Sequence, residues 1–223
     1  MRKGWKKLIA AVAALVVVIT SGTVQNISAV EPDTVIDEIT VTYGQTEARS
    51  MLDMINEFRT GDDAWAWDEE GQRVEYNNLQ ELTYDPALER VAMQRAAEII
   101  FNWSHTRPNG ESCFTAYPSG YMTKGENIAR WQYSAEEAFV SWREDNEKYS
   151  GQGHRRNMLS EEFTAVGIAH VVYNGQHYWV QEFGSPASGE TVSAPVDGEQ
   201  AVSIEFLNEE QKITGIYLGQ ENI

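Results

Sequence analysis

The sequence predicts an α+β fold, with helices layered against a sheet, rather than a doubly wound parallel sheet. Amphipathic helical patterns come first along the chain, and two strand-like segments, 166–173 and 177–183, follow them. Asn174 and Gly175 join these segments, which is the strongest short hairpin signal because both residues accept a positive φ. Helices that precede a terminal hairpin are typical of α+β or layered αβα domains.

The composition excludes several classes of protein. Among 223 residues, Lys and Arg total 17 and Asp and Glu total 34, so the formal net charge is −17. Such a chain repels phosphate backbones and anionic lipid, so we expect no nucleic acid as a partner and no docking on charged membranes. Hydrophobic residues at 42% and aromatic residues at 11% are too frequent for a disordered chain.

The N-terminus has the pattern of a secretory signal peptide at 1–29. A basic start is followed by an unbroken apolar run at 8–19 and by small residues before Val30. The apolar run is short for a membrane span, although an uncleaved anchor is the alternative. We therefore expect a secreted protein, extracellular or loosely attached to the cell wall, with no membrane contact after cleavage.

The single cysteine, Cys113, excludes an internal disulfide, so the core must be stable without one. Cys113 follows no apolar run and is interpreted as a small, partly buried residue rather than a catalytic nucleophile.

The first half of the mature chain reads as a leader, a helix and a hairpin. Residues 30–45 are an extended leader with the alternation of one strand, and 47–59 follow the helical apolar spacing. Residues 64–76 predict a hairpin that carries Trp65 and Trp67. These tryptophans could form a carbohydrate platform, but covering an edge of the core is the favoured interpretation.

Two further helices have clear starts. Asp85 is a good N-cap and Pro86 a good first residue for a helix at 86–103. Ser134 and Glu137 form a capping box for a helix at about 135–147, and a short turn follows at 154–159.

The end of the chain is predicted to lie outside the main domain. Residues 185–199 have the composition of a linker, and 200–223 form a tail with two strand patterns, at 202–206 and 213–217. Two strands are too few for an independent domain, so the tail docks on the main domain, pairs with another chain or stays free. We expect 46–184 to fold without it.

Loop histidines are the first candidates for a functional site. His105 and His154 follow helices in glycine-containing loops, whereas His170 and His177 alternate with core-type residues in the hairpin and are interpreted as structural. The sequence contains no HExxH helix, GxSxG elbow, P-loop or CxxC pair.

Nearby carboxylates could complete such a site. Glu126 lies in a short segment of small residues. On a continued helix Asp145 would lie about 60° from the inward-facing Trp142, and Glu144 about 160° from it, so Asp145 is expected to face a cleft and Glu144 to face solvent. Two imidazoles with two carboxylates suit a divalent cation or a general acid–base pair.

Five segments in order resemble a known family. They are SHTRPNG (104–110), GENIA (125–129), GHRRNML (153–159), AVGIAHVV (165–172) and YWVQEFG (178–184). Together they resemble the SCP-like domain of the CAP superfamily, named for cysteine-rich secretory proteins, antigen 5 and pathogenesis-related proteins, and most closely its cysteine-poor bacterial branch. The resemblance covers about 46–184 and implies a three-layer αβα sandwich with a small antiparallel sheet between helices.

The resemblance also implies a cleft lined by two histidines and two acids. The family's histidines fall on His105 and His154 and the glutamate of its GEN segment on Glu126. Its second acid falls on Asp145, where the family has a longer glutamate, and Glu144 lies one position off the pattern. Some members bind divalent cations there, zinc in particular, some eukaryotic members bind sterols or other lipids, and proteolysis has been proposed for a few.

Three functions follow as expectations. The first is a secreted, non-catalytic module that binds zinc or another divalent cation through His105, Glu126, His154 and Asp145, and an extracellular or cell-wall ligand. The second is a secreted hydrolase, in which His105, Glu126 and His154 activate water. The third is an envelope interaction protein that makes contacts through its tail and its tryptophan hairpin and has a vestigial cleft.

Overall fold

The structure is a computed structural model that describes residues 33–208. The predicted signal peptide at 1–29 and the second strand pattern of the tail, at 213–217, lie outside the described residues. The strands are β1 (Thr34–Gly44), β2 (Trp65–Trp67), β3 (Arg73–Glu75), β4 (Thr83–Tyr84), β5 (Thr123–Arg130), β6 (Ala165–Tyr173), β7 (Gln176–Ser185) and β8 (Asp197–Leu207). The helices are α1 (Gln45–Thr60), α2 (Pro86–Glu98), α3 (Ala135–Arg143) and α4 (Gly153–Leu159), with 3-10 turns η1 (Cys113–Ala116) and η2 (Tyr149–Gly151).

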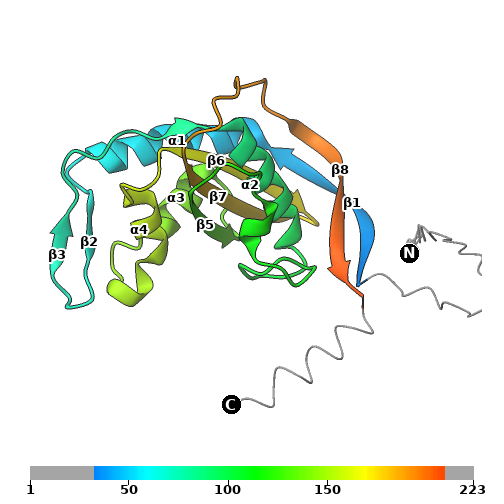
Figure 1. Ribbon diagram of the computed structural model, residues 1–223, viewed down its shortest axis with the longest axis horizontal. Helices are drawn as coiled ribbons and strands as arrows, with labels where there is room; N and C mark the ends of the chain where they lie inside the picture. The colour runs from blue at the N-terminus through cyan, green and yellow to red at the C-terminus, as the bar shows by residue number, and fades with distance from the viewer. Residues whose placement is uncertain (1–32, 209–223) are drawn as a thin grey trace, which may run out of the picture.

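Six strands form one sheet between two layers of helices (Figure 1). Its order is β5-β7-β6-β1-β8, with β4 added in parallel to β6 and every other pair antiparallel. α1, α3 and α4 cover one face, over a core that includes Trp142 and Trp179. α2 covers the other face, over a core that includes Ala96 and Val180. The three-layer αβα sandwich expected from the sequence is confirmed. No helix within residues 33–208 is long and apolar enough to cross a membrane.

The backbone of α2 packs directly on Gly167 of β6. A Cβ atom at this position would lie 2.0 Å from the amide nitrogen of Glu89 and 2.1 Å from the carbonyl carbon of Leu88, so only glycine permits the contact. The helix begins as predicted, because Asp85 accepts a hydrogen bond from the amide of Ala87 at 2.8 Å. The packing on Gly167 fixes α2 against the sheet and so positions the side chains farther along the helix.

α2 ends earlier than the sequence predicts, at Glu98 rather than near residue 103. The carbonyl of Glu98 accepts hydrogen bonds from the amides of Phe101 and Asn102 at 3.0 and 3.1 Å, which tightens the last turn and redirects the chain. Trp103 therefore lies outside the helix.

α3 also ends early, at Arg143 rather than near residue 147. Side chains from α4 and the loop before it bond the carbonyls at its end. Nη1 of Arg155 donates to the carbonyl of Arg143 at 2.8 Å, and Nε2 of Gln152 donates to the carbonyl of Glu144 at 3.2 Å. Glu144 then has a left-handed φ of 50°, which turns the chain out of the helix.

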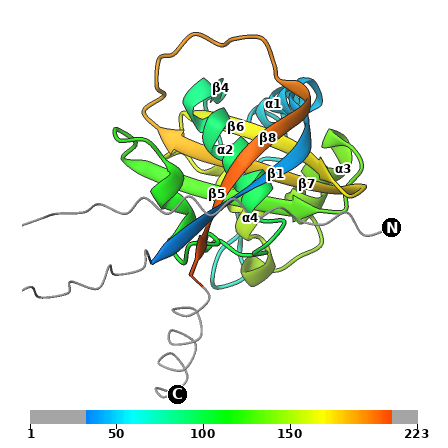
Figure 2. The same cartoon turned by 90° about the vertical axis from the view of Figure 1, so that its right-hand side faces the viewer.

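β1 and β8 form a long antiparallel ribbon (Figure 2). The ribbon is paired from Thr34 and Leu207 at one end to Gly44 and Asp197 at the other. β1 joins β6 through only two residue pairs. The predicted leader strand and the first predicted tail strand therefore pair with each other.

The ribbon completes the core beneath α2. Ile39, Val41 and Tyr43 of β1 and Ile204 of β8 are all buried in this core. These residues lie outside the range 46–184, so the domain boundary drawn from the sequence cuts through the core of the folded domain.

The predicted linker at 185–199 is shorter in the structure and is not free. β7 continues to Ser185 and β8 begins at Asp197. Between them, Ser188 donates from its amide and its hydroxyl to the carboxylate of Asp85, both at 2.6 Å. The segment is therefore fastened to the start of α2.

β6 and β7 form the predicted hairpin, with Asn174 and Gly175 at positive φ in the turn. His170 and His177 lie side by side on these strands, with Nε2 of His170 2.9 Å from Nδ1 of His177. The ring of His170 stacks on Trp179 with centroids 3.9 Å apart. This packing accords with the structural role expected for both histidines.

We expect buried His170 to make the fold less stable in acid. Burial, and then the neighbouring His177, lower the pKa of His170 from 6.5 to about 4. Between these values the unfolded chain binds more protons, so this contribution to stability is present above pH 6.5 and is lost as the pH falls toward 4. In urea unfolding between pH 6 and 5, His170→Gln should reduce the slope of stability against pH by about 1 kcal/mol per pH unit. Equal slopes in the two proteins would contradict this account.

Candidate functional site

His105 and Glu126 form the first of two histidine–glutamate pairs. Glu126 lies on β5 with its side chain 1% exposed, and its Oε1 is 2.7 Å from Nδ1 of His105. Because an ionised carboxylate only accepts hydrogen bonds, Nδ1 carries a proton, and in the neutral ring Nε2 then has a free lone pair. The His105 side chain is 57% exposed, so the ring is accessible from solvent.

Arg95 of α2 keeps Glu126 ionised. Its Nε donates to Oε2 of Glu126 at 2.7 Å and its Nη2 donates to Oε1 at 3.3 Å. Burial alone would raise the pKa of Glu126, but the hydrogen bonds from His105 and Arg95 outweigh burial and hold this pKa at about 2. Glu126 is therefore a permanent acceptor that orients His105.

A second acid, Glu182 of β7, lies across the strand pair from Glu126. Burial, followed by the charge of Glu126, raises the pKa of Glu182 well above its ordinary value. The pair therefore carries one proton, which resides on Glu182, while Glu126 carries the negative charge. The hydroxyl of Tyr117 lies 2.7 Å from Oε2 of Glu182 and completes this buried layer.

Cys113 lies close to the first pair but keeps its proton. His105, Cys113 and Glu126 form a group whose possible ligand atoms all lie within 4.8 Å of one another. A cysteine binds metal as the thiolate, and burial, with the charges of Glu126 and Glu182, raises the pKa of Cys113 to about 12. Nε2 of His105 is therefore the uncommitted ligand atom of this group.

His154 and Glu144 form the second pair. Oε1 of Glu144 is 2.5 Å from Nδ1 of His154, at the start of α4. The other carboxylate oxygen accepts from the backbone amides of His154 and Arg155 at 3.0 and 3.2 Å. The carboxylate thus holds both the ring and the helix start, and in the neutral ring of His154 it leaves Nε2 with a free lone pair.

The structure places Glu144, rather than Asp145, against His154. The sequence interpretation assumes that α3 continues past these residues, whereas the helix ends at Arg143. Asp145 instead accepts from Nη1 of Arg155 at 2.7 Å and from Arg143 at 3.2 and 3.3 Å. The expected orientations are therefore wrong: Asp145 is bound by arginines and Glu144 does not face solvent.

Neighbouring residues of β5 anchor the two pairs. Glu126 holds His105, and Nδ2 of Asn127 donates to the carbonyl of His154 at 3.1 Å. Asn157 of α4 donates to Oδ1 of Asn127 at 2.8 Å and ties the helix to the strand. Successive side chains of a strand point to opposite faces, and β5 is an edge strand, so the two histidines come from opposite layers beside one edge.

The four groups form two pairs rather than one tight cluster. Within residues 33–208, the group of possible metal ligands that lie within 4.8 Å of one another includes His105 but not His154. The arrangement nevertheless suits a cation. Metal-binding histidines commonly donate their other ring nitrogen to a carboxylate, and both pairs have this hydrogen bond. His105 and His154 would then be the ligands, with Glu126 and Glu144 as the groups that orient them.

The tryptophan hairpin β2–β3 packs on α4. The guanidinium of Arg155 lies 4.3 Å from the ring centroid of Trp65, and the amide of Trp67 donates to Oε1 of Gln152 at 2.8 Å. These contacts favour the packing interpretation of the two tryptophans and link them to the helix that carries His154.

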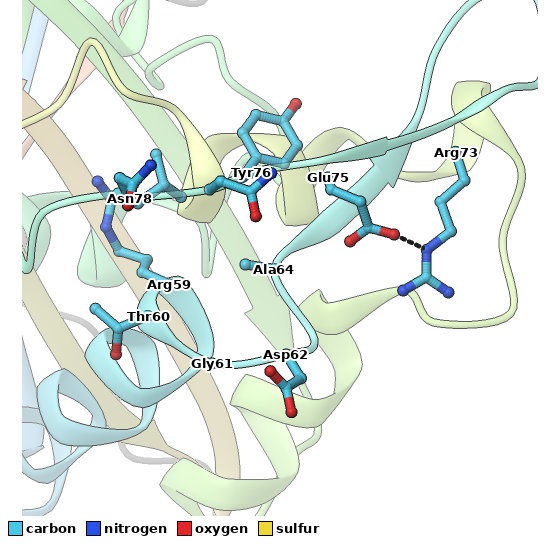
Figure 3. Close-up of a pocket in the computed structure, with 11 residues that line it drawn as sticks. Arg59, Thr60, Gly61, Asp62, Ala64, Arg73, Glu75, Tyr76 and Asn78 are labelled. Carbon is cyan, nitrogen blue, oxygen red and sulfur yellow. Dashed lines mark hydrogen bonds and ion pairs between the residues drawn. The ribbon is translucent and has the colours of Figure 1, made fainter.

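A hollow of about 530 Å³ lies between the end of α1 and β3 (Figure 3). None of the four histidines lines it. Its Arg73 pairs with Glu75 at 2.6 Å, and the guanidinium of its Arg59 donates to backbone carbonyls, that of Met158 among them. Its arginines are thus satisfied by the protein itself, and we assign it no role.

Sequence analysis did not identify three members of the site, although two of them are charged residues among apolar neighbours in the sequence. Arg95 lies on the apolar stripe of α2, between Val91 and Ile99, where a charge requires a buried partner. Glu182 follows Gln181 between the apolar residues Val180 and Phe183 of β7, where a charge also requires a buried partner. Tyr117 lies in an irregular segment, where no periodicity indicates burial.

Comparison with known proteins identifies one family whose sequence profile matches this chain. The sequence profile of the cysteine-rich secretory protein family, CAP, matches residues 52–183. A protein of Bacillus subtilis (strain 168), named YkwD and described as uncharacterized, is 30% identical over 110 residues. That alignment covers 47% of this chain and 40% of the relative, so this chain spans less than half of the relative's length.

Solved structures show a similar arrangement at low identity. An outer surface protein from Borrelia burgdorferi matches with a TM-score of 0.46 and 18% identity, over 61% of this chain and 90% of that chain. The crystal structure of NaASP2 with Zn²⁺ matches with a TM-score of 0.46 and 19% identity, over 67% of this chain and 84% of that chain. At these values the matches concern the fold alone.

Proposed function

This chain belongs to the cysteine-rich secretory protein family, and from that premise we propose that it is an exported, non-catalytic module that binds one divalent cation through His105 and His154. The observation that carries the proposal is the matched pair of histidine–glutamate hydrogen bonds at the edge strand β5. Each carboxylate fixes the proton on Nδ1, so both Nε2 atoms are ready to bind a cation without a change of tautomer. Zinc accepts imidazole nitrogen readily and is the expected ion.

The surroundings favour binding over catalysis. A general base works best with a pKa near the working pH, whereas hydrogen bonds hold the pKa of Glu126 at about 2 despite its burial. Both oxygens of Glu126 are also bound by Arg95. We therefore do not propose the hydrolase in which Glu126 activates water. The envelope interaction protein that makes contacts through its tail and its tryptophan hairpin is also disfavoured, because β8 is bound along its length to β1 and the hairpin packs on α4.

Export and an extracellular or cell-wall ligand complete the proposal. Export is supported by the signal-peptide pattern at 1–29. A bound cation would connect the loop of His105 with α4 around the edge of the sheet, and it would offer open coordination positions to an oxygen-bearing ligand.

Zinc titration tests the cation site. Calorimetry at 0.1 M salt, where the Debye length is about 10 Å, suppresses diffuse attraction to the acidic surface. We expect one site in the wild type and none in His105→Ala or His154→Ala. Glu144→Gln should weaken binding by about 10-fold or more, since it loosens the orientation of His154. Histidine must be neutral to bind the metal, so affinity should also fall in acid.

Asp145 supplies the matched control. Asp145→Asn should leave zinc affinity within about two-fold, because this carboxylate is bound by Arg143 and Arg155 and not by His154. An equal loss of zinc affinity in Asp145→Asn and Glu144→Gln would contradict the assignment of Glu144 as the residue that orients His154. Wild-type binding in both histidine variants would show that the ion lies elsewhere.

A further inference from the structure

An exposed cluster of Trp103, Arg130 and Trp131 lies at the end of β5. The guanidinium of Arg130 lies 4.5 Å from the ring centroid of Trp103 and 4.1 Å from that of Trp131. Trp103 is 38% exposed and Trp131 is 57% exposed. Two large indoles that hold a cation between them and still face solvent are not explained by packing of the core. We call these three residues the Trp–Arg–Trp cluster.

The side chain of Arg130 has no acceptor in the part of the chain that the structure describes. Every other arginine side chain within residues 33–208 donates a hydrogen bond to a carboxylate or to a backbone carbonyl, whereas Arg130 has only its two ring contacts. This is unusual in a chain in which acids outnumber bases two to one. The donors of the guanidinium are therefore free for an outside acceptor, and the rings fix its plane.

The backbone at Trp131 is held in an unfavourable form. Its φ is 77°, in the left-handed region that bulky side chains avoid. The amide of Trp131 donates to the carbonyl of His177 at 2.9 Å, and Nε1 of Trp179 donates to the carbonyl of Gln132 at 2.8 Å. These bonds to β7 hold Trp131 against Arg130, and strain of this kind gathers at functional positions.

The cluster lies on the same side of the sheet as the first histidine–glutamate pair. Side chains alternate along β5, so Arg130 shares a face with Glu126. Trp103 precedes His105 by two residues in the loop after α2. A ligand on the cluster would therefore lie along the strand from His105 and need not compete with a cation there.

We propose that the Trp–Arg–Trp cluster binds a sugar that carries a carboxylate. The C–H face of a pyranose ring is apolar and packs on a flat indole, and indoles lose little freedom on binding. The fork of Arg130 matches a carboxylate with two parallel hydrogen bonds. The negative net charge disfavours a densely charged polyanion far more than a glycan with isolated carboxylates. This assignment does not depend on the proposed cation site.

Nuclear magnetic resonance of the indole N–H groups tests it. The full chain contains seven tryptophans, whose signals can be assigned with single Trp→Phe variants. The probe is the disaccharide of N-acetylglucosamine and N-acetylmuramic acid, which carries one carboxylate, and chitobiose is the matched sugar without it. We expect the disaccharide to shift the signals of Trp103 and Trp131 and to bind about 10-fold more tightly than chitobiose. Arg130→Gln should abolish that difference between the sugars.

Arg73 gives a control of the same type. Its guanidinium lies 4.6 Å from the ring centroid of Trp65, but it is already paired with Glu75. Arg73→Gln should leave the affinity unchanged. The proposal is overturned if the disaccharide shifts neither indole, if Arg130→Gln binds both sugars as the wild type does, or if Arg73→Gln weakens binding equally. It is also overturned if the two indoles respond only to protein concentration, which would make the cluster a contact between copies of this chain.

Discussion

Replacing Arg95 with leucine is expected to lower the free energy of unfolding by about 3–5 kcal/mol, the usual cost of removing one partner from a buried ion pair. Arg95 is fully buried and binds Glu126 through two nitrogens. It also binds Glu98 at 2.8 Å and the carbonyl of Ser104 at 2.8 Å. The substitution removes a buried donor from Glu126, which keeps His105, and from Glu98, which keeps Gln94 and Arg107.

Urea unfolding followed by circular dichroism measures this loss, and Arg90→Leu on the same helix is the control. Arg90 pairs with Glu190 at the surface, with side chains 61% and 47% exposed, so the control should change stability by no more than about 0.5 kcal/mol. If both variants lose the same stability, the buried hydrogen bonds and ion pairs of Arg95 do not stabilise the fold as we expect.

Acid should reduce the difference in the free energy of unfolding between Arg95→Leu and the wild type. The folded pKa of Glu126 is about 2, because its hydrogen bonds with His105 and Arg95 outweigh its burial, and its ordinary value is 4.5. The stability contributed by the ionised form is complete above pH 4.5 and disappears as the pH falls toward 2. Much of the stability that Arg95 contributes comes from its interaction with this carboxylate. The free energies of unfolding of the two proteins should therefore differ less at pH 3 than at pH 7.

Ending the chain at Ser185 is expected to cost at least about 4 kcal/mol, or to prevent cooperative folding. Ile204 is fully buried, and removing a buried isoleucine side chain alone costs about 2–5 kcal/mol. The truncation also uncovers Val41 and Tyr43, which Ile204 packs beside in the core under α2. It further removes the backbone partner of β1 along the ribbon.

Thermal melts of the truncated chain and of two point variants separate these contributions. Ile204→Ala should lower the melting temperature markedly, whereas Ile36→Ala, at a position 64% exposed on the same ribbon, should change little. A truncated chain that melts cooperatively near the wild-type temperature would restore the boundary at residue 184 drawn from the sequence.

Local signals predicted the parts of the fold that local forces decide. The β6–β7 hairpin follows from Asn174 and Gly175, and the start of α2 follows from Asp85 and Pro86. The resemblance added the αβα layering and the positions of His105, Glu126 and His154. Each of these features depends on residues close together in the sequence or on a recognisable segment.

The errors arise where distant residues decide local structure. α3 ends at Arg143 because Gln152 and Arg155 bond the carbonyls at its end, and no propensity within the helix reveals this. That early end exchanges the roles of Glu144 and Asp145. The ribbon was missed for the same reason: β1 and β8 pair across most of the chain, and the alternating pattern of a strand does not show which strand it pairs with.

The pairing of Thr34 with Leu207 also determines how the domain would respond to mechanical tension. The two ends of the described chain leave the ribbon side by side, and the amide of Asn208 donates to the carbonyl of Asp33 at 2.9 Å. A force that pulls these ends apart acts across the strands, so it loads one residue pair at a time rather than shearing all pairs together. The ribbon would open like a zipper toward Gly44 and Asp197 before the force reached the helices. If the domain were stretched between attachments at both ends, β1 and β8 would separate and extend first. Their separation would uncover the core beneath α2.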